Sequence, residues 1–226
     1  MNPDQLLAYY EQVADAPDAI PRLRLFILDL AVRGKLVAQD PADELASELH
    51  QRLAERFKTT KQATRRGRRA EVSGIISEPP FELPELWSWV RMGEIGDTNI
   101  GLTYSPTNIG EKGIPVLRSN NVQNGKIDLS QLVRVDMQPK ASVMVAQGDM
   151  LICARNGSRS LVGKAAIIDN LLEPMAFGAF MAIFRSPLNP YLHMFLSSPV
   201  FRQVIDEVNT NTINQITQTN LRSTLV

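Results

Sequence analysis

The first part of the chain repeats apolar residues at helical spacing. Between positions 20 and 30 they recur at steps of three and four, as Ile20, Leu23, Ile27 and Leu30. That period gives a helix one apolar stripe. Gly34 should end this helix, because glycine readily takes the left-handed conformation common after helix ends, and Arg33 and Lys35 then lie near the negative end of the dipole. A shorter stripe precedes it after the helix-start signal Asn2-Pro3 and comprises Leu6, Tyr10 and Val13.

A second helix is expected after Asp40-Pro41, with Asp43 in its first turn. Apolar residues at four-residue spacing form a narrow stripe along it: Leu45, Leu49, Leu53 and Phe57. A narrow stripe is typical of a helix with one partner helix. The partner could lie within the same small helical domain or belong to another protein, and both alternatives remain open. Residues 1–57 are therefore predicted to form a helical scaffold region.

Residues 58–82 are predicted to be a basic linker. Apolar residues are nearly absent until Val72, and cations gather at Lys61, Arg65, Arg66, Arg68 and Arg69. Such a run is usually just solvated, although it could also contact phosphates as an arm. Prolines between Pro79 and Pro84 mark the boundary to the next part, residues 83–226.

From Trp87 the pattern changes to short apolar or alternating runs separated by Gly, Pro, Asn and Asp, which predicts strands. These runs are 114–118, 125–129, 132–135, 150–155, 161–168 and 179–185. Asn124-Gly125 is a strong hairpin-turn signal. Helices return after Asn189-Pro190 and Ser198-Pro199, each expected to act as a cap followed by proline, and Phe201, Val204, Ile205 and Val208 form an apolar face of the second. The predicted fold class is α+β, an N-terminal helical region followed by a β-rich domain with C-terminal helices.

Composition narrows the class of protein. The 226 residues have a formal net charge of 0, which argues against a general nucleic-acid coat protein but allows a local basic face. One cysteine, Cys153, excludes an intramolecular disulfide, and with only His50 and His193 it cannot complete a standard structural zinc site. The start lacks signal-peptide features and no apolar run reaches the length of a membrane span, so a cytoplasmic location is expected. The last residues, Leu225-Val226, carry no stop signal, which favours a piece of a longer protein.

Several segments resemble catalytic or nucleotide-binding motifs, but each lacks a residue that its motif requires. Gly157 and Gly163-Lys164-Ala165 differ from a P-loop, which needs four residues between its glycines and Ser or Thr after the lysine. Asn189-Pro190-Tyr191 lacks the second proline of the amino-methyltransferase loop. Cys153 and His193 lie in apolar segments typical of core residues, and Ser158 has no Gly-x-Ser-x-Gly context. No catalytic residue, metal site or bound cofactor is expected for this chain.

Polar recognition is the remaining chemistry. Side chains able to read base edges or hold phosphates lie near the ends of predicted strands: Tyr104, Ser105, Arg118, Asn120, Asn121, Arg155, Asn156, Ser158, Arg159 and Lys164. Arginine reads guanine, asparagine reads adenine, and hydroxyls take phosphate. The alternative is that Asn and Ser only build turns. For Arg118 and Arg155 the contact role is favoured, because loops on a rigid β scaffold suit binding. Lys164 is expected to contact phosphate.

Five segments resemble the specificity (S) subunits of type I restriction–modification systems. They are 23–41, which is similar to the conserved helical segment of that family, 82–95, which is similar to the entry to its target recognition domain, and the internal signatures 113–122, 148–157 and 162–164; residues 191–198 and 212–225 fit its C-terminal helices. Members usually carry two recognition domains, and this chain has room for one.

The resemblance implies sequence-specific binding of double-stranded DNA, one half of a bipartite site, without catalysis. Methylation (M) subunits would supply S-adenosylmethionine and adenine-N6 chemistry, a restriction (R) subunit would cleave, and a second S half could pair with this one. The stripe Leu45, Leu49, Leu53 and Phe57 would then contact partner helices. Two alternatives stay open: a protein-interaction scaffold without a DNA role, and a stand-alone DNA methyltransferase, which the missing glycine-rich cofactor turn disfavours.

Overall fold

The computed structural model describes residues 17–62, 76, 78–208 and 215–226. Its α-helices are α3 (Ala19–Val32), α4 (Ala46–Gln62), α5 (Met92–Ile95), α6 (Asn189–Leu196), α7 (Pro199–Val208) and α8 (Gln218–Ser223). Its strands are β1 (Asp97–Ile100), β2 (Ile109–Gly110), β3 (Ile114–Leu117), β4 (Val122–Gln123), β5 (Lys126–Ile127), β6 (Val133–Val135), β7 (Met150–Cys153), β8 (Ala165–Ile167), β9 (Ala176–Phe177) and β10 (Met181–Arg185). The predicted α+β class is confirmed.

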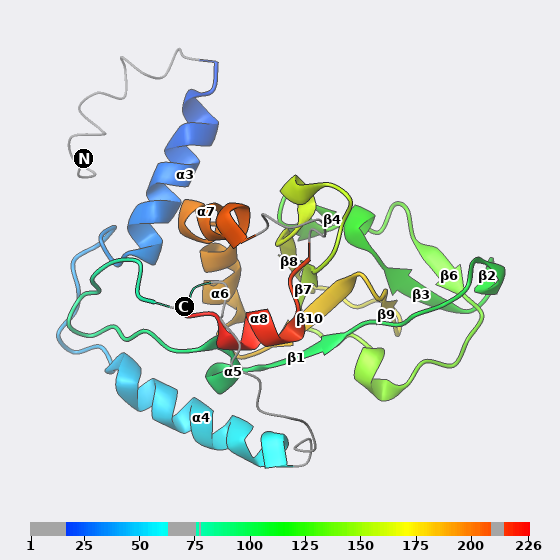
Figure 1. The fold of residues 1–226 in the computed structure, drawn as a ribbon, viewed down its shortest axis with the longest axis horizontal. Coiled ribbons are helices and arrows are strands. Elements are labelled where there is room, and N and C mark those ends of the chain that lie inside the picture. Colours follow the sequence, from blue (N-terminus) through cyan, green and yellow to red (C-terminus); the bar gives the residue numbers. More distant parts are fainter. Residues whose placement is uncertain (1–16, 63–75, 77, 209–214) are drawn as a thin grey trace.

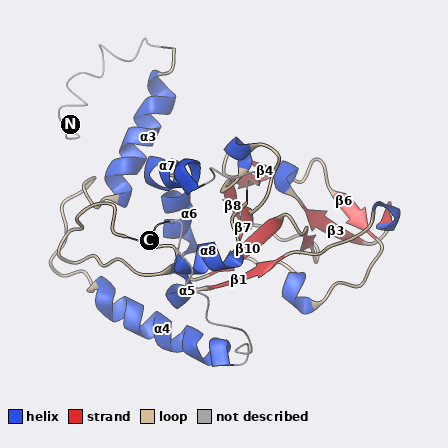
Figure 2. Cartoon of the chain, in the orientation of Figure 1, coloured by secondary structure: helices blue, strands red, loops and turns tan. Residues whose placement is uncertain are grey.

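The strands form two sheets and a hairpin. An antiparallel sheet has the order β1-β10-β7-β8, and a mixed sheet has the order β2-β6-β3-β9 with β3 and β9 parallel. Figure 1 shows the first sheet beside α6, α7 and α8, and the second projecting away from the helices. Figure 2 shows the same division, with most helices at one end of the molecule and most strands at the other. The helical end and the sheet end therefore meet along the first sheet.

Both faces of the first sheet are buried, which explains why β7 reads as a continuous apolar run. Alternate residues of a strand point to opposite faces. Met150 and Ile152 pack with Phe184, Phe195 and the other residues of the helical side. Leu151 and Cys153 pack on the opposite face, in a cluster that also holds Phe177. The sheet is thus a central layer, and the loops at its ends are fixed by two cores.

The predicted end of the first described helix is confirmed. Gly34 has φ of 66°, and the amides of Gly34 and Lys35 donate to the carbonyls of Ala31 and Leu30 at 3.0 and 2.8 Å. This pair of bonds is the glycine-terminated helix end expected from the sequence. The Asn124-Gly125 turn is confirmed as well, with φ of 51° and 74° between β4 and β5.

The predicted start of the next helix is wrong. Asp40 makes a turn instead, because its carboxylate accepts the amide of Ala42 at 2.9 Å, and α4 begins only at Ala46. At its other end α4 continues to Gln62, into the predicted linker. Most of the basic cluster and the predicted helix over Leu6 to Val13 lie outside the described residues.

Of the two helix caps predicted near the C-terminus, one is confirmed and one is wrong. Ser198 caps α7, since its hydroxyl accepts the amide of Phe201 at 3.4 Å. Asn189 is not a cap: it lies inside the first turn of α6, and its buried amide donates to the carbonyls of Gly148 and Phe184 at 2.7 and 2.9 Å. Its role is to tie α6 to β10 and to the turn before β7. The side chains of Val204 and Val208 lie outside the description.

Candidate nucleic-acid interface

A hollow of about 420 Å³ lies between α4 and the core, but a second hollow, at the ends of the strands, gathers the predicted recognition residues. This strand-end hollow has a volume of about 370 Å³ and is lined by Leu102, Thr103, Tyr104, Arg118, Ser119, Asn120, Gly178, Ala179, Phe180 and Met181. None of these lining residues is acidic. Three of the predicted residues, Tyr104, Arg118 and Asn120, therefore share one concave surface.

Backbone hydrogen bonds bring the lining loops together. The amide of Leu102 donates to Phe177 at 2.7 Å, and that of Ala179 donates back to Leu102 at 2.9 Å. Gly178 donates to Leu117 at 2.9 Å, which joins the same turn to the end of β3. A Cβ at Gly101 would lie 2.2 Å from the Phe177 carbonyl oxygen, so the close approach requires glycine there. The hollow is thus a rigid junction between both sheets.

Arg155 reaches this junction from the end of β7. Its amide donates to the carbonyl of Phe180 at 3.0 Å, and its guanidinium carbon lies 5.4 Å from the centre of the Phe180 ring. Phe180 as a residue is 61% exposed. Arg155 is itself exposed, so the stacked guanidinium faces solvent beside the hollow. A cation over an aromatic face is attracted by its quadrupole, which holds the guanidinium in place.

Arg118 has a different setting. Its Nε atom is buried and has no hydrogen-bond partner, although the residue as a whole is only partly buried. A buried donor without a partner is costly, so a shift of the side chain that lets Nε meet an acceptor on a ligand would gain affinity. Within the described part of the chain no carboxylate forms an ion pair with Arg118 or Arg155. Both guanidinium groups are therefore available to an anionic or hydrogen-bond-accepting ligand.

Asn121 is a correction to the predicted set. It is 0% exposed, and its side chain accepts from the amide of Arg118 and donates to the carbonyl of Asp128, both at 2.9 Å. A buried side chain with its oxygen and nitrogen both paired cannot meet a base. Asn121 instead fixes the turn that presents Arg118 and Asn120. It thus follows the alternative that asparagine here builds a turn.

Other predicted hydroxyl and amide residues also build turns. Ser105 accepts from the hydroxyl of Thr107 at 2.9 Å and, through its amide, donates to Asn108. Asn156 accepts the amide of Ser158 at 2.9 Å and donates to the hydroxyl of Ser119 at 3.3 Å. The bond from Asn156 to Ser119 links the loop after β7 to the rim of the hollow. Ser105 and Ser158 remain exposed, so their contact roles stay predictions.

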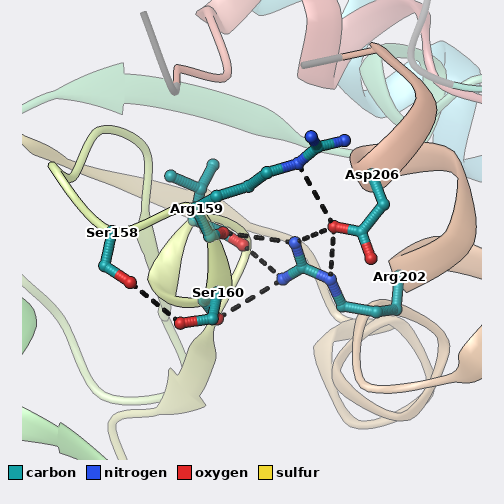
Figure 3. A network of polar contacts seen from close by, with 6 residues as sticks. Ser158, Arg159, Ser160, Arg202 and Asp206 are labelled. Carbon is teal, nitrogen blue, oxygen red and sulfur yellow. Dashed lines mark hydrogen bonds and ion pairs between the residues drawn. The ribbon is translucent and has the colours of Figure 1, made fainter. Parts of the chain in front are cut away.

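Arg159, in the loop after β7, belongs to a separate polar network with two residues of α7, which Figure 3 shows. Its Nε is 3.6 Å from the carboxylate of Asp206, which also pairs with Arg202 at 2.5 Å. Arg202 in turn donates to the backbone carbonyls of Arg159 and Val162 at 3.2 and 3.0 Å. Hydrogen bonding from Arg202 keeps the pKa of Asp206 below its usual value, with Arg159 adding a weaker effect. The network fastens the loop to α7.

Lys164 also lies away from the strand-end hollow. It lines a hollow shared with Gly163, Phe201 and Ile205, between β8 and α7. Of the predicted recognition residues, Tyr104, Arg118 and Asn120 therefore line the strand-end hollow, Arg155 and Asn156 adjoin it, and Arg159 and Lys164 lie beside α7. Phe180 was missing from the prediction, because an aromatic residue in an apolar run is usually core.

The predicted partner stripe on α4 is largely turned inward. Leu53 is 7% exposed and belongs to the main core cluster, against which Leu49 also packs. Leu45 lies before the helix and is 42% exposed. Phe57 lines a hollow beside Arg185. The alternative of packing within the chain holds for Leu49 and Leu53, and only Leu45 of the stripe is largely open to a partner.

Cys153 and His193, which were considered for catalysis, have surroundings typical of residues that stabilise the fold. Cys153 is buried, and burial raises the pKa of its thiol. His193 contacts the carbonyl of Ala165 through Nε2 at 3.1 Å. Among the described residues no cluster of His, Cys, Asp or Glu could hold a metal ion, and none of the described helices is both long and apolar enough to cross a membrane.

Two curated specificity subunits are similar to this chain, one along almost its whole length and one along about a third of it. The chain is 29% identical over 225 residues to the EcoAI specificity subunit, a type I restriction enzyme component of Escherichia coli, covering 96% of this chain and 38% of that protein. It is 48% identical over 81 residues to the EcoEI specificity subunit of Escherichia coli, covering 35% of this chain and 14% of the relative. No family model matches the chain.

A solved structure shares the fold. A chain from work on complex assembly and conformational transition of the type I R-M system superposes with a TM-score of 0.50 at 20% identity, covering 92% of this chain and 46% of that one. The chain thus spans less than half the length of these proteins. The resemblance to the specificity subunits of type I restriction–modification systems, indicated by the sequence motifs, is thereby confirmed.

Proposed function

We propose that this chain recognises one half of a split sequence in double-stranded DNA. The observation that carries the proposal is the strand-end hollow, where the guanidinium groups of Arg118 and Arg155 lie among loops that hold no carboxylate. Arginine pairs with guanine through two parallel hydrogen bonds, and Asn120 beside it is suited to adenine. The similarity to specificity subunits supports the same function.

The proposal extends to the partners. The chain itself performs no catalysis and binds no cofactor; methylation subunits bind S-adenosylmethionine and transfer the methyl group to adenine N6, and a restriction subunit cleaves. A second recognition module reads the other half of the site. The similarity to a type I restriction enzyme specificity subunit supports this part of the proposal. Calorimetry with S-adenosylmethionine tests this part, since tight one-to-one binding would contradict it.

Contacts to the methylation subunits are proposed for the helical end. Ile20, Leu25 and Ile27 on α3 are 46%, 47% and 40% exposed, so they offer apolar surface that the described part of the chain leaves uncovered. Burying such side chains stabilises a complex by about 1.5–3 kcal/mol each at most. Leu25→Glu should therefore reduce co-purification with the methylation subunits while leaving DNA affinity unchanged. Equal co-purification of this variant and the parent chain would contradict the assignment.

Selection from randomised duplexes tests the DNA proposal. The full chain should enrich a defined sequence, and Arg118→Ala and Arg155→Ala should each weaken binding to it by about 1–3 kcal/mol and relax preference at one position. Arg22→Ala is the matched control, because it removes the same charge from a side chain that is 79% exposed on α3. If no sequence is enriched, or if all three variants behave alike, the proposal fails.

A further inference from the structure

We propose that Phe180 reads a thymine, through its C5-methyl group, in the base pair next to the one read by Arg155. This inference rests on the proposed DNA-recognition function and assigns a specificity role to a residue outside the predicted set. Phe180 is 61% exposed, a large fraction for an aromatic side chain in a chain that buries Phe177, Phe184, Phe195 and Phe201 almost completely. It lines the strand-end hollow beside Tyr104 and Arg118.

The backbone of Phe180 is held rigidly. Its carbonyl accepts the amides of both Ala154 and Arg155 at 3.0 Å. The turn before it is fixed by the bond from Gly178 to Leu117 at 2.9 Å, and Met181 closes it by donating to Gly178 at 2.8 Å. With its backbone fixed, only the two side-chain torsions of Phe180 remain to be ordered on binding, which keeps the entropic cost of the contact low.

Arg155 determines how the ring can be used. Its guanidinium lies over the ring at 5.4 Å from the centroid, and one face of Phe180 is therefore occupied. A wedge between two base pairs needs both faces of a ring. Phe180 instead presents its edge and remaining face, which suits apolar contact with a base edge. In the major groove the apolar feature of base edges is the thymine methyl group.

The spacing of the two side chains links their targets. Successive bases are separated by about 3.4 Å along a strand. The guanidinium and the ring are 5.4 Å apart, which is more than one such step and less than two, so we assign them to neighbouring base pairs. Arg155 pairs with acceptors and Phe180 with a methyl group, so the expected feature is a guanine with a thymine in the adjacent pair. Because the ring also orients Arg155, losing Phe180 should weaken the guanine preference as well.

The test uses the full chain and duplexes selected from a randomised pool. Wild type should require thymine beside the guanine that Arg155→Ala no longer selects, and Phe180→Ala should lose the thymine requirement. Replacing that thymine by uracil removes only the methyl group. It should weaken wild-type binding about fourfold, as expected for burial of one methyl group, and leave Phe180→Ala unaffected. Phe180→Leu should keep part of the methyl dependence.

Leu172→Ala is the matched control, since Leu172 is 75% exposed and lies outside the hollow. Thermal unfolding shows that each variant folds. Equal effects of uracil on wild type and Phe180→Ala would overturn the inference while leaving the proposed function intact. So would a selected sequence with no thymine beside that guanine, or loss of affinity in Phe180→Ala without methyl dependence, which a wedge would give. If the wild type selects no sequence, both proposals fail.

Discussion

Replacing Arg202 by alanine should loosen the loop that follows β7 far more than loss of a surface ion pair would. The guanidinium donates to the carbonyls of Ser160, Arg159 and Val162 at 3.4, 3.2 and 3.0 Å and pairs with Asp206. Figure 3 shows these bonds converging from α7 onto the loop. Arg202→Ala removes all of them together.

The size of the effect follows from their geometry. A hydrogen bond from a charged donor contributes about 1.5–3 kcal/mol, and the low end applies because the Arg202 side chain is 35% exposed and two of the bonds are long. The exposed pair with Asp206 adds at most about 1 kcal/mol. Only the bond to Val162, at 3.0 Å, is short enough to count at that low end, and together with the ion pair it sets the expected fall in the free energy of unfolding at about 2–3 kcal/mol. Arg22→Ala is the control, because it breaks an exposed i,i+4 pair with Asp18 within one stretch of the chain, and should cost under about 0.5 kcal/mol.

Urea denaturation followed by circular dichroism measures the two variants. Hydrogen exchange adds a local reading at the amides of Leu161 and Val162, which donate within the loop at 3.2 Å. These should exchange faster in Arg202→Ala than in Arg22→Ala. Equal unfolding free energies in the two variants, with unchanged exchange at both amides, would refute the reasoning that Arg202 holds the loop.

Further outcomes follow from other buried groups. Asn121→Ala should destabilise the fold by about 2–3 kcal/mol in urea denaturation, because it leaves buried backbone groups unpaired, while the exposed Asn120→Ala should stay within about 0.5 kcal/mol; equal costs would contradict the turn-building role. Arg185→Ala should lower the free energy of unfolding by about 1–3 kcal/mol, since it leaves the Asp149 carboxylate, which is 2% exposed, without the ion pair from Arg185, which is itself 48% exposed; a cost no larger than that of Arg22→Ala would contradict a role for Arg185 in holding the buried carboxylate. Burial raises the pKa of Tyr191 to about 12, so stability should be unaffected below pH 10 and should fall between pH 10 and 12 by up to about 3 kcal/mol, measured by thermal unfolding against Tyr191→Phe, which should lose this dependence.

Local signals predicted the fold well where one residue type fits one conformation. Gly34 and Asn124-Gly125 have positive φ, and both were predicted from sequence because few other residues accept it. β7 and β10 were predicted because their residues are apolar on both faces. β9 was missed, because its two residues pair in parallel with β3, a distant segment, and no local pattern encodes that pairing.

Asp40-Pro41 and Asn189-Pro190 show why helix starts are harder to predict. Both pairs carry a signal for capping, yet Asp40 closes a turn on its own and Asn189 donates to two carbonyls, one of them of Gly148. The same short polar side chain serves a cap, a turn or a tertiary bond equally well. The choice between these depends on acceptors far along the chain, which the sequence alone does not locate.

The candidate site was predicted in part for the same reason. Arg118 and Arg155 were placed correctly at strand ends, because an apolar run followed by arginine marks the point where a strand leaves the core. Asn121 was misassigned since its burial depends on the carbonyl of Asp128. Phe180 was missed because a phenylalanine within an apolar run is usually a core residue. Whether its ring is exposed depends on the turns around it, which the sequence does not show.

The central claim is that the strand-end hollow reads a DNA sequence. The most direct measurement compares the affinity of the full chain for its selected duplex and for a scrambled duplex at one fixed salt concentration. The wild type should bind the selected duplex at least about a hundredfold more tightly, and the double variant of Arg118→Ala and Arg155→Ala should bind both about equally. A double variant that keeps the wild-type ratio, or a wild type that does not distinguish the two duplexes, would contradict the claim.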